Sequence, residues 1–215
     1  MARTTGDPAL WSDVLPQGLI PQILDMVLSV WGGMAKPHRR TREVPITKRF
    51  LTARKEDKNM RQTVPVRISR ECVEDDMRTG RELGRIDLCF IPANRCREQV
   101  YFAFECKRLN VVYRSGKRNT LAPAYVKLGM MRFINSKYAS HLNEGGMIGY
   151  VMDRDLASAI KAVDNNVVRN RAAVKMKPPG GLGTSSVLPA DPSTKETVHD
   201  LGARKFIIHH VFLPL

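Results

Sequence analysis

Charged side chains interrupt two strongly apolar segments of the chain, 85–91 and 100–106, which predict neighbouring strands joined by a short polar turn. The first segment carries Asp87, and the second contains Glu105 near its end, with Lys107 directly beyond it. An unpaired charge in such surroundings costs several kcal/mol, so these side chains require partners. Because side chains alternate along a strand, Glu105 and Lys107 lie on the same face. The sequence therefore predicts that the three charged groups meet at one site.

The residue types at this site favour a divalent cation. Magnesium prefers oxygen ligands and keeps several waters, so a protein supplies only one or two carboxylates. Asp87 and Glu105 meet that need for Mg²⁺ or Mn²⁺, with the backbone carbonyl of Cys106 as a further ligand. A bound metal acidifies a water and neutralises charge on a phosphate, and Lys107 would orient or deprotonate that water or stabilise the reacting phosphorus. The alternative is an ordinary cross-strand ion pair at a sheet edge.

The charge balance indicates a polyanionic partner. The 215 residues include 35 Lys and Arg against 21 Asp and Glu, which gives a net charge of +14. Such an excess favours nucleic acid; DNA is favoured over RNA as the partner, although no sequence feature separates the two. An anionic membrane surface is the competing partner, but the sequence shows no basic amphipathic helix or lipidation motif. Its longest apolar stretch, 19–31, is too short to span a bilayer.

The cysteines and the first residues favour a cytoplasmic protein. The cysteines form no CxxC pair, and two of them lie in apolar segments, which is typical of reduced core thiols; they are Cys72, Cys89, Cys96 and Cys106. The first residues lack the basic-then-apolar pattern of a secretory signal. We therefore expect a cytoplasmic location without disulfides.

Periodicity predicts a mixed α/β domain. Residues 1–40 are expected to form an irregular arm and an amphipathic helix, and residues 41–215 a single domain with a flexible loop near 175–197. Apolar spacing predicts helices over 18–31, 44–54, 120–140 and 156–169, and strands over 64–69, 85–91, 100–106, 147–152 and 205–212. The polar segment 71–84 is expected to be a loop. This order predicts a mixed central sheet flanked by helices on both faces.

The arrangement resembles the PD-(D/E)xK nuclease superfamily, which has the restriction-endonuclease-like fold. The resemblance covers about 41–152 and consists of an aspartate in one strand, Glu-x-Lys at the end of the next, then a basic segment, a helix and another core strand. It implies that Asp87 and Glu105 bind the metal and that Lys107 is catalytic. The chain departs from the family pattern at Ile86, where the family has proline.

The resemblance also implies a catalytic glutamate on the helix before the sheet. Glu43 is the best match, with Glu56, Glu71 and Glu74 as alternatives. It further implies a Mg²⁺-dependent endonuclease that leaves 5′-phosphate ends, a homodimer if both strands are cut, and a role in restriction or anti-phage defence. The helix over 18–31 supplies either the dimer contact or part of the core. A non-catalytic basic nucleic-acid-binding or assembly protein of the same fold is the alternative.

Basic residues near the expected site indicate where nucleic acid would bind. Their side chains would contact backbone phosphates, and a solvated basic loop is the alternative. These residues are Arg39, Arg40, Arg108, Arg114, Lys117 and Arg118. Lys127 and Arg132, on the following helix, face either the site or solvent. Tyr113 and Tyr125 are candidates for stacking on bases, with packing in the core favoured for Tyr125.

Overall fold

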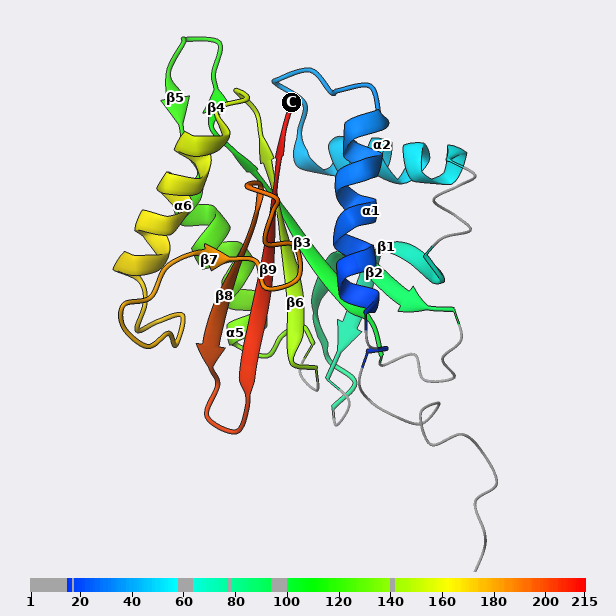
Figure 1. Ribbon diagram of the computed structural model, residues 1–215, viewed down its shortest axis with the longest axis vertical. Coiled ribbons are helices and arrows are strands. Elements are labelled where there is room, and N and C mark those ends of the chain that lie inside the picture. Colours follow the sequence, from blue (N-terminus) through cyan, green and yellow to red (C-terminus); the bar gives the residue numbers. More distant parts are fainter. Residues whose placement is uncertain (1–14, 17, 58–63, 77–78, 94–99, 140–141) are drawn as a thin grey trace, which may run out of the picture.

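The computed structural model, which describes residues 15–16, 18–57, 64–76, 79–93, 100–139 and 142–215, contains a seven-stranded mixed sheet with helices on both faces (Figure 1). The strand order is β1-β2-β3-β6-β9-β8-β7. These strands are β1 (Val66–Asp75), β2 (Glu82–Pro92), β3 (Phe102–Leu109), β6 (Glu144–Val151), β7 (Gly183–Thr184), β8 (Thr194–Asp200) and β9 (Lys205–Pro214). A separate hairpin pairs β4 (Val111–Val112) with β5 (Arg118–Asn119). The predicted mixed α/β class is confirmed.

The sheet combines antiparallel margins with a parallel centre. The first three strands form an antiparallel meander, β3, β6 and β9 run parallel, and β8 and β7 are again antiparallel. Parallel neighbours need a crossover, and a helical segment supplies it between β3 and β6. That segment consists of α4 (Ala122–Ala124), η2 (Tyr125–Met130) and α5 (Met131–Ile134), and the remaining helices are α1 (Leu19–Gly33), α2 (Glu43–Glu56) and α6 (Leu156–Arg169).

Two apolar cores lie on opposite faces of the sheet. One packs beneath α1 and α2, and the other packs beneath the α4–η2–α5 segment and α6. The central strand β6 serves both, because Ile148 and Tyr150 belong to the first core and Met147 and Val151 to the second. Burial on both faces explains why this strand reads as an apolar run rather than as an alternating pattern.

The N-terminal helix α1 belongs to the first core. Its Trp31 ring stacks on Tyr150 with 5.4 Å between ring centroids, and Trp31 Nε1 donates a hydrogen bond to the carbonyl of Pro214 at 2.7 Å. The helix α1 is therefore packed against the domain predicted for 41–215. Of the two roles expected for this helix, the structure shows the packing role.

Some element boundaries differ from those expected. β1 and β2 occupy most of the segment 71–84 that was predicted to be a loop, because its polar residues form an antiparallel pair at the sheet edge. The helix predicted over 120–140 ends at Ile134, and its π-helical turn changes which side chains face the sheet, so that Leu128 is 62% exposed. The loop predicted near 175–197 contains β7, and β8 begins at Thr194.

Cys72, Cys89 and Cys106 are free. Cys96 and the N-terminal arm over 1–14 lie outside the described residues. Within the described ranges, no helix combines the length and apolar character that crossing a bilayer requires.

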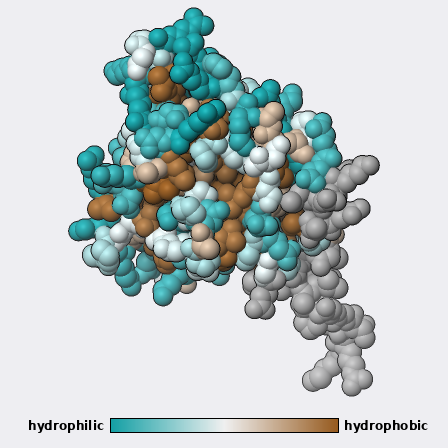
Figure 2. Space-filling model, turned by 45° about the horizontal axis from the view of Figure 1, so that its top comes forward, coloured by the Kyte–Doolittle hydropathy of each residue, from teal (hydrophilic) through white to brown (hydrophobic). Residues whose placement is uncertain are grey.

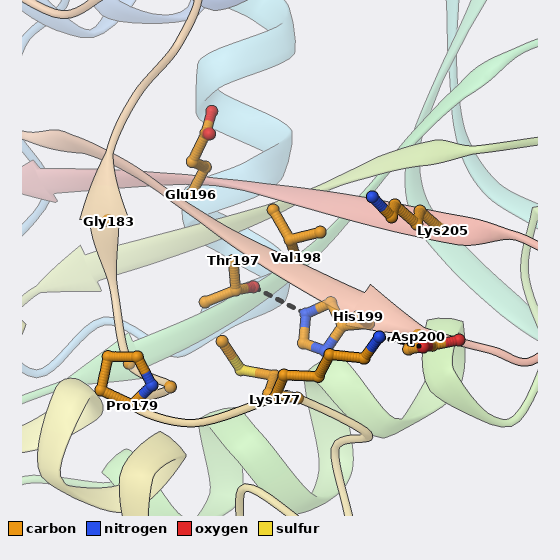
Figure 3. Close-up of a pocket in the computed structure, with 12 residues that line it drawn as sticks. Lys177, Pro179, Gly183, Glu196, Thr197, Val198, His199, Asp200 and Lys205 are labelled. Atoms are coloured by element: carbon orange, nitrogen blue, oxygen red, sulfur yellow. Dashed lines mark hydrogen bonds and ion pairs between the residues drawn. The ribbon is translucent and has the colours of Figure 1, made fainter.

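A buried chain of hydrogen bonds connects η2 to β9 and β8. Tyr125 Oη lies 2.9 Å from His210 Nδ1, and Thr197 Oγ1 lies 2.9 Å from His210 Nε2. The same threonine hydroxyl lies 2.7 Å from His199 Nε2 (Figure 3), whose Nδ1 lies 2.6 Å from the Val174 carbonyl. With both imidazoles neutral, each donor in the chain has an acceptor. Tyr125 donates to His210, His210 to Thr197, Thr197 to His199, and His199 to the Val174 carbonyl. Burial lowers the pKa of both histidines, that of His199 to about 4.

Acid should weaken this chain. An unfolded histidine binds a proton near pH 6.5, whereas folded His199 does so only near pH 4, so stability from the neutral ring is present above pH 6.5 and is lost as the pH falls towards 4. We expect a loss of about 3 kcal/mol in unfolding free energy across this window. The variant His199→Gln has no group that titrates at this position. The difference in unfolding free energy between wild type and this variant, measured by urea denaturation, should therefore shrink by that amount on acidification. A constant difference would contradict the neutral assignment.

Candidate functional site

The candidate site lies where β2 and β3 separate. Their last ladder pair before the separation is Leu88 opposite Phe104. Beyond it, the Asp87 side chain replaces a ladder partner, because its Oδ2 accepts the backbone N–H of Cys106 at 2.7 Å. The separated strands leave room for long polar side chains between the sheet and its covering helices.

Glu105 and Lys107 pair on one face of β3, as the alternation predicted. Lys107 Nζ lies 2.6 Å from Glu105 Oε1 and 2.8 Å from the carbonyl of Cys106. Glu105 is only 2% exposed. Gly129 lets η2 approach here, since a Cβ at that position would lie 2.4 Å from Met147 Cε and 3.6 Å from Lys107 Cγ. The lysine is thereby confined next to the carboxylate.

Glu43, the first residue of α2, is the helix carboxylate that reaches this pair. Its Oε1 lies 3.4 Å from Lys107 Nζ, and its Oε2 accepts the backbone N–H of Arg108 at 3.0 Å. The alternatives lie elsewhere: Glu56 ends α2, and Glu74 accepts the hydroxyl hydrogen bond of Tyr101 at 2.7 Å. Glu71 acts on the site only through its charge, which raises the pKa of Asp87.

Arg132 extends from α5 into the site. Of the two orientations expected for it, towards the site or towards solvent, the structure shows the first. Its Nε lies 3.2 Å from Glu105 Oε1, and its guanidinium lies over the Tyr138 ring, 5.3 Å from the centroid. A Cβ on Gly84 would lie 3.0 Å from Arg132 Nη1, so the absence of a side chain there makes room for the arginine. The sequence did not single out Tyr138 or Gly84, because their importance depends on the fold rather than on a motif.

The site holds more negative than positive charge. Burial raises the pKa values of Glu43, Asp87 and Glu105, and that of Glu105 rises to about 7 although Lys107 and Arg132 oppose the shift. Burial alone would lower the pKa of Lys107, but the carboxylates of Glu105 and Glu43 outweigh it, so the pKa of Lys107 is raised. Lys107 is therefore a protonated ammonium among three carboxyl groups.

Three kinds of oxygen near the cluster are of the type that a hard divalent cation prefers. Glu105 Oε2 is buried without a hydrogen-bond partner, which leaves one carboxylate oxygen ready to accept a ligand bond. Asp87 and the Cys106 carbonyl supply further oxygens beside it. Within the described part of the chain, however, no group of three or more His, Cys, Asp or Glu side chains is placed so that it could hold a metal ion. Here the acidic groups surround the Lys107 ammonium.

The predicted nucleic-acid contacts divide into engaged and exposed groups. Arg108 Nη1 donates to the Thr41 carbonyl at 3.4 Å, and Arg118 Nη2 forms an ion pair with Asp153 Oδ2 at 2.8 Å. Tyr125 is fully buried, so the packing role favoured for it is confirmed. The side chains of Arg39, Arg40, Arg114 and Lys117 are exposed, and that of Arg118 is also exposed despite its ion pair.

Two cavities lie outside the carboxylate cluster. One, of about 450 Å³, is lined by residues that include Arg39, Val112 and Arg154. The other, of about 400 Å³, lies between β8 and the 176–183 segment and contains none of the predicted site residues (Figure 3). Neither of these two cavities is lined by Asp87, Glu105 or Lys107.

Comparisons with protein-family models, with curated proteins and with solved structures find no match to this chain.

Replacing Glu105 with Gln should stabilise the metal-free protein above pH 7. The folded state binds this proton more readily than the unfolded chain, so ionisation of Glu105 weakens folding progressively as the pH rises from 4.5 to about 7. Gln mimics the neutral acid, and we expect Glu105→Gln to raise the unfolding free energy by roughly 1–3 kcal/mol in EDTA, measured by urea denaturation. The exposed control Glu82→Gln should change it by less than about 0.5 kcal/mol. Lower stability of Glu105→Gln would contradict the charge imbalance.

Proposed function

We propose that this chain is a divalent-metal-dependent nuclease that hydrolyses phosphodiester bonds, in DNA rather than RNA, on a restriction-endonuclease-like fold. The observation that carries the proposal is the meeting of Asp87, Glu105 and Glu43 around Lys107 where β2 and β3 separate. An antiparallel meander leading into a parallel strand beside β3 supports the fold assignment. The net charge of +14 supports a nucleic-acid substrate.

The proposed metal ligands are Asp87, Glu105 and the Cys106 carbonyl, which would hold Mg²⁺ or Mn²⁺. A cation there would acidify a bound water and neutralise charge on the scissile phosphate. Glu43 would position a water or a second cation from the start of α2. Lys107, being protonated, is suited to donate hydrogen bonds to an anionic phosphate or to the attacking water rather than to remove its proton.

The biological setting belongs to the same proposal. Cutting both strands of a duplex requires two sites, so we propose a homodimer for that reaction. Because α1 is packed in the core, the dimer contact would use another surface. A role in restriction or anti-phage defence follows by analogy with the fold.

One observation favours a second candidate function, a basic nucleic-acid-binding protein without catalysis. Lys107 Nζ, at 2.6 Å from Glu105 and 2.8 Å from the Cys106 carbonyl, compensates the same oxygens that a metal would use. An ammonium that never leaves this position would make the cluster a purely structural ion-pair network.

Plasmid cleavage distinguishes the two functions. We expect nicking in Mg²⁺ or Mn²⁺, none in EDTA, and a loss of at least about 100-fold in rate for Lys107→Ala, because an aligned donor to the reacting phosphate is removed. Lys205→Ala, an exposed lysine at the far end of β9, is the matched control and should cut at the wild-type rate.

A second readout does not depend on activity. Saturating Mg²⁺ at about 100 times its dissociation constant should raise the unfolding free energy of the wild type by about 2.7 kcal/mol and leave that of Asp87→Asn nearly unchanged. Tight, salt-sensitive DNA binding with no cleavage and no stabilisation by either metal would favour the binding protein.

A further inference from the structure

The β4–β5 hairpin projects from the end of the sheet where β3 carries Lys107 (Figure 1). Its tip is a tight turn in which the Tyr113 N–H donates to the Lys117 carbonyl at 2.9 Å and the Gly116 N–H donates to the Tyr113 carbonyl at 3.0 Å. Gly116 has φ of 79°, the left-handed conformation that this kind of three-residue hairpin loop requires. The tip therefore has a defined shape.

The base of the hairpin is fixed to the start of α6. Arg118 Nη2 lies 2.8 Å from Asp153 Oδ2 and donates to Ser158 Oγ at 2.8 Å. Asn110, which precedes β4, donates from Nδ2 to Asp153 Oδ1 at 3.1 Å. These contacts account for Arg118 structurally, and they hold the tip at a constant position relative to β3 and β6.

The tip exposes an aromatic ring between cations. Tyr113 is 45% exposed, whereas the other four tyrosines are at most 5% exposed. Arg114 and Lys117, on either side of the turn, are exposed as well. An aromatic face that no core covers, next to two cations, suits a base with its adjoining phosphates.

A cavity of about 450 Å³ continues from the hairpin towards the connection between α1 and α2. Its apolar lining includes Val112, directly before Tyr113, and its cationic lining includes Arg39 and Arg154. In Figure 2 the upper end of the molecule is a largely hydrophilic projection. Val112 thus connects the tip to a cavity whose lining is mixed, with apolar residues, the cations Arg39 and Arg154, and the acidic Asp153.

We propose that this surface, named here the hairpin site and defined by Tyr113, Arg114, Lys117, Arg39 and Val112, binds unpaired nucleotides of a DNA strand. This inference rests on the proposed nuclease function and specifies its substrate as DNA with a single-stranded segment. Tyr113 stacks on a base, and the cations hold the flanking phosphates. In continuous duplex the faces of the bases are stacked on each other, so the ring would lack a partner.

The spacing connects the hairpin site to the carboxylate cluster. Tyr113 lies six positions beyond Lys107, so the two are at most about 20 Å apart along the chain. At the 3.4 Å per step of a stacked strand in duplex DNA, that span corresponds to at most roughly six nucleotide steps, and an unstacked strand covers it in fewer. A strand whose scissile phosphate lies at Lys107 therefore reaches Tyr113 within a few nucleotides of the cut.

Fluorescence anisotropy in EDTA tests the hairpin site without cleavage. The probes are a thymidine oligonucleotide of about 15 nucleotides, an abasic oligonucleotide of equal length, and a blunt duplex. We expect Tyr113→Ala to weaken binding of the thymidine probe about 5- to 100-fold while leaving the abasic probe unchanged, and Tyr113→Phe to retain wild-type affinity. Arg114→Gln should weaken both single-stranded probes and reduce the salt slope by about 1, whereas the distant control Lys205→Gln should not.

The outcomes of this assay test the hairpin site independently of the nuclease function. Equal affinity of wild type and Tyr113→Ala for the thymidine probe overturns the hairpin site, as does an equal loss on the abasic probe. A duplex bound as tightly as the thymidine probe, with the same dependence on Tyr113, overturns the single-stranded substrate. Because the assay needs neither metal nor Lys107, a protein that passes it but cuts no plasmid overturns only the nuclease proposal.

Discussion

Three carboxyl groups and two cationic side chains share the partly buried space at the end of β3, and this charge imbalance shapes the region. Lys107 contacts Glu105 at 2.6 Å and Glu43 at 3.4 Å, and Arg132 contacts Glu105 at 3.2 Å, yet the pKa of Glu105 stays raised to about 7. Buried carboxylates that outnumber the neighbouring cations lower the stability of the protein unless a further cation binds and compensates their charge. Under the proposed nuclease function, a divalent cation bound at the cluster would supply this relief.

The surrounding core fixes the geometry of this cluster. Phe104, directly before Glu105, packs edge-on against Phe90 and Phe102, with ring centroids 5.5 and 5.0 Å away. Those aromatic contacts lie on the opposite face from the carboxylate and set the position of β3 where β2 leaves it. Glu105 and Lys107 thus lie on a strand that the core holds in place, while the hairpin that follows is fixed separately through Arg118.

Strand alternation and apolar runs were enough to predict β3, its Glu105–Lys107 face and the neighbouring Asp87. Glu43 was one of four candidates, because a contact between α2 and β3 spans more than sixty positions and leaves no local pattern. Arg132 could not be oriented from sequence, since the π-helical turn over Tyr125–Met130 changes the helical phase on which such a prediction depends. The first part of β1 was predicted as the strand over 64–69, but its second part was taken for a loop because these edge residues are polar.

A crystal structure grown with saturating Mn²⁺, with the metal located by anomalous scattering, tests the central claim most directly. We predict an ion bound by oxygens of Asp87 and Glu105 at about 2.1 Å, with Lys107 Nζ moved away from its 2.6 Å contact with Glu105. An absence of anomalous density at the cluster, with the ammonium still bonded to Glu105, would show that the lysine is the permanent cation of this site and would contradict metal-dependent catalysis.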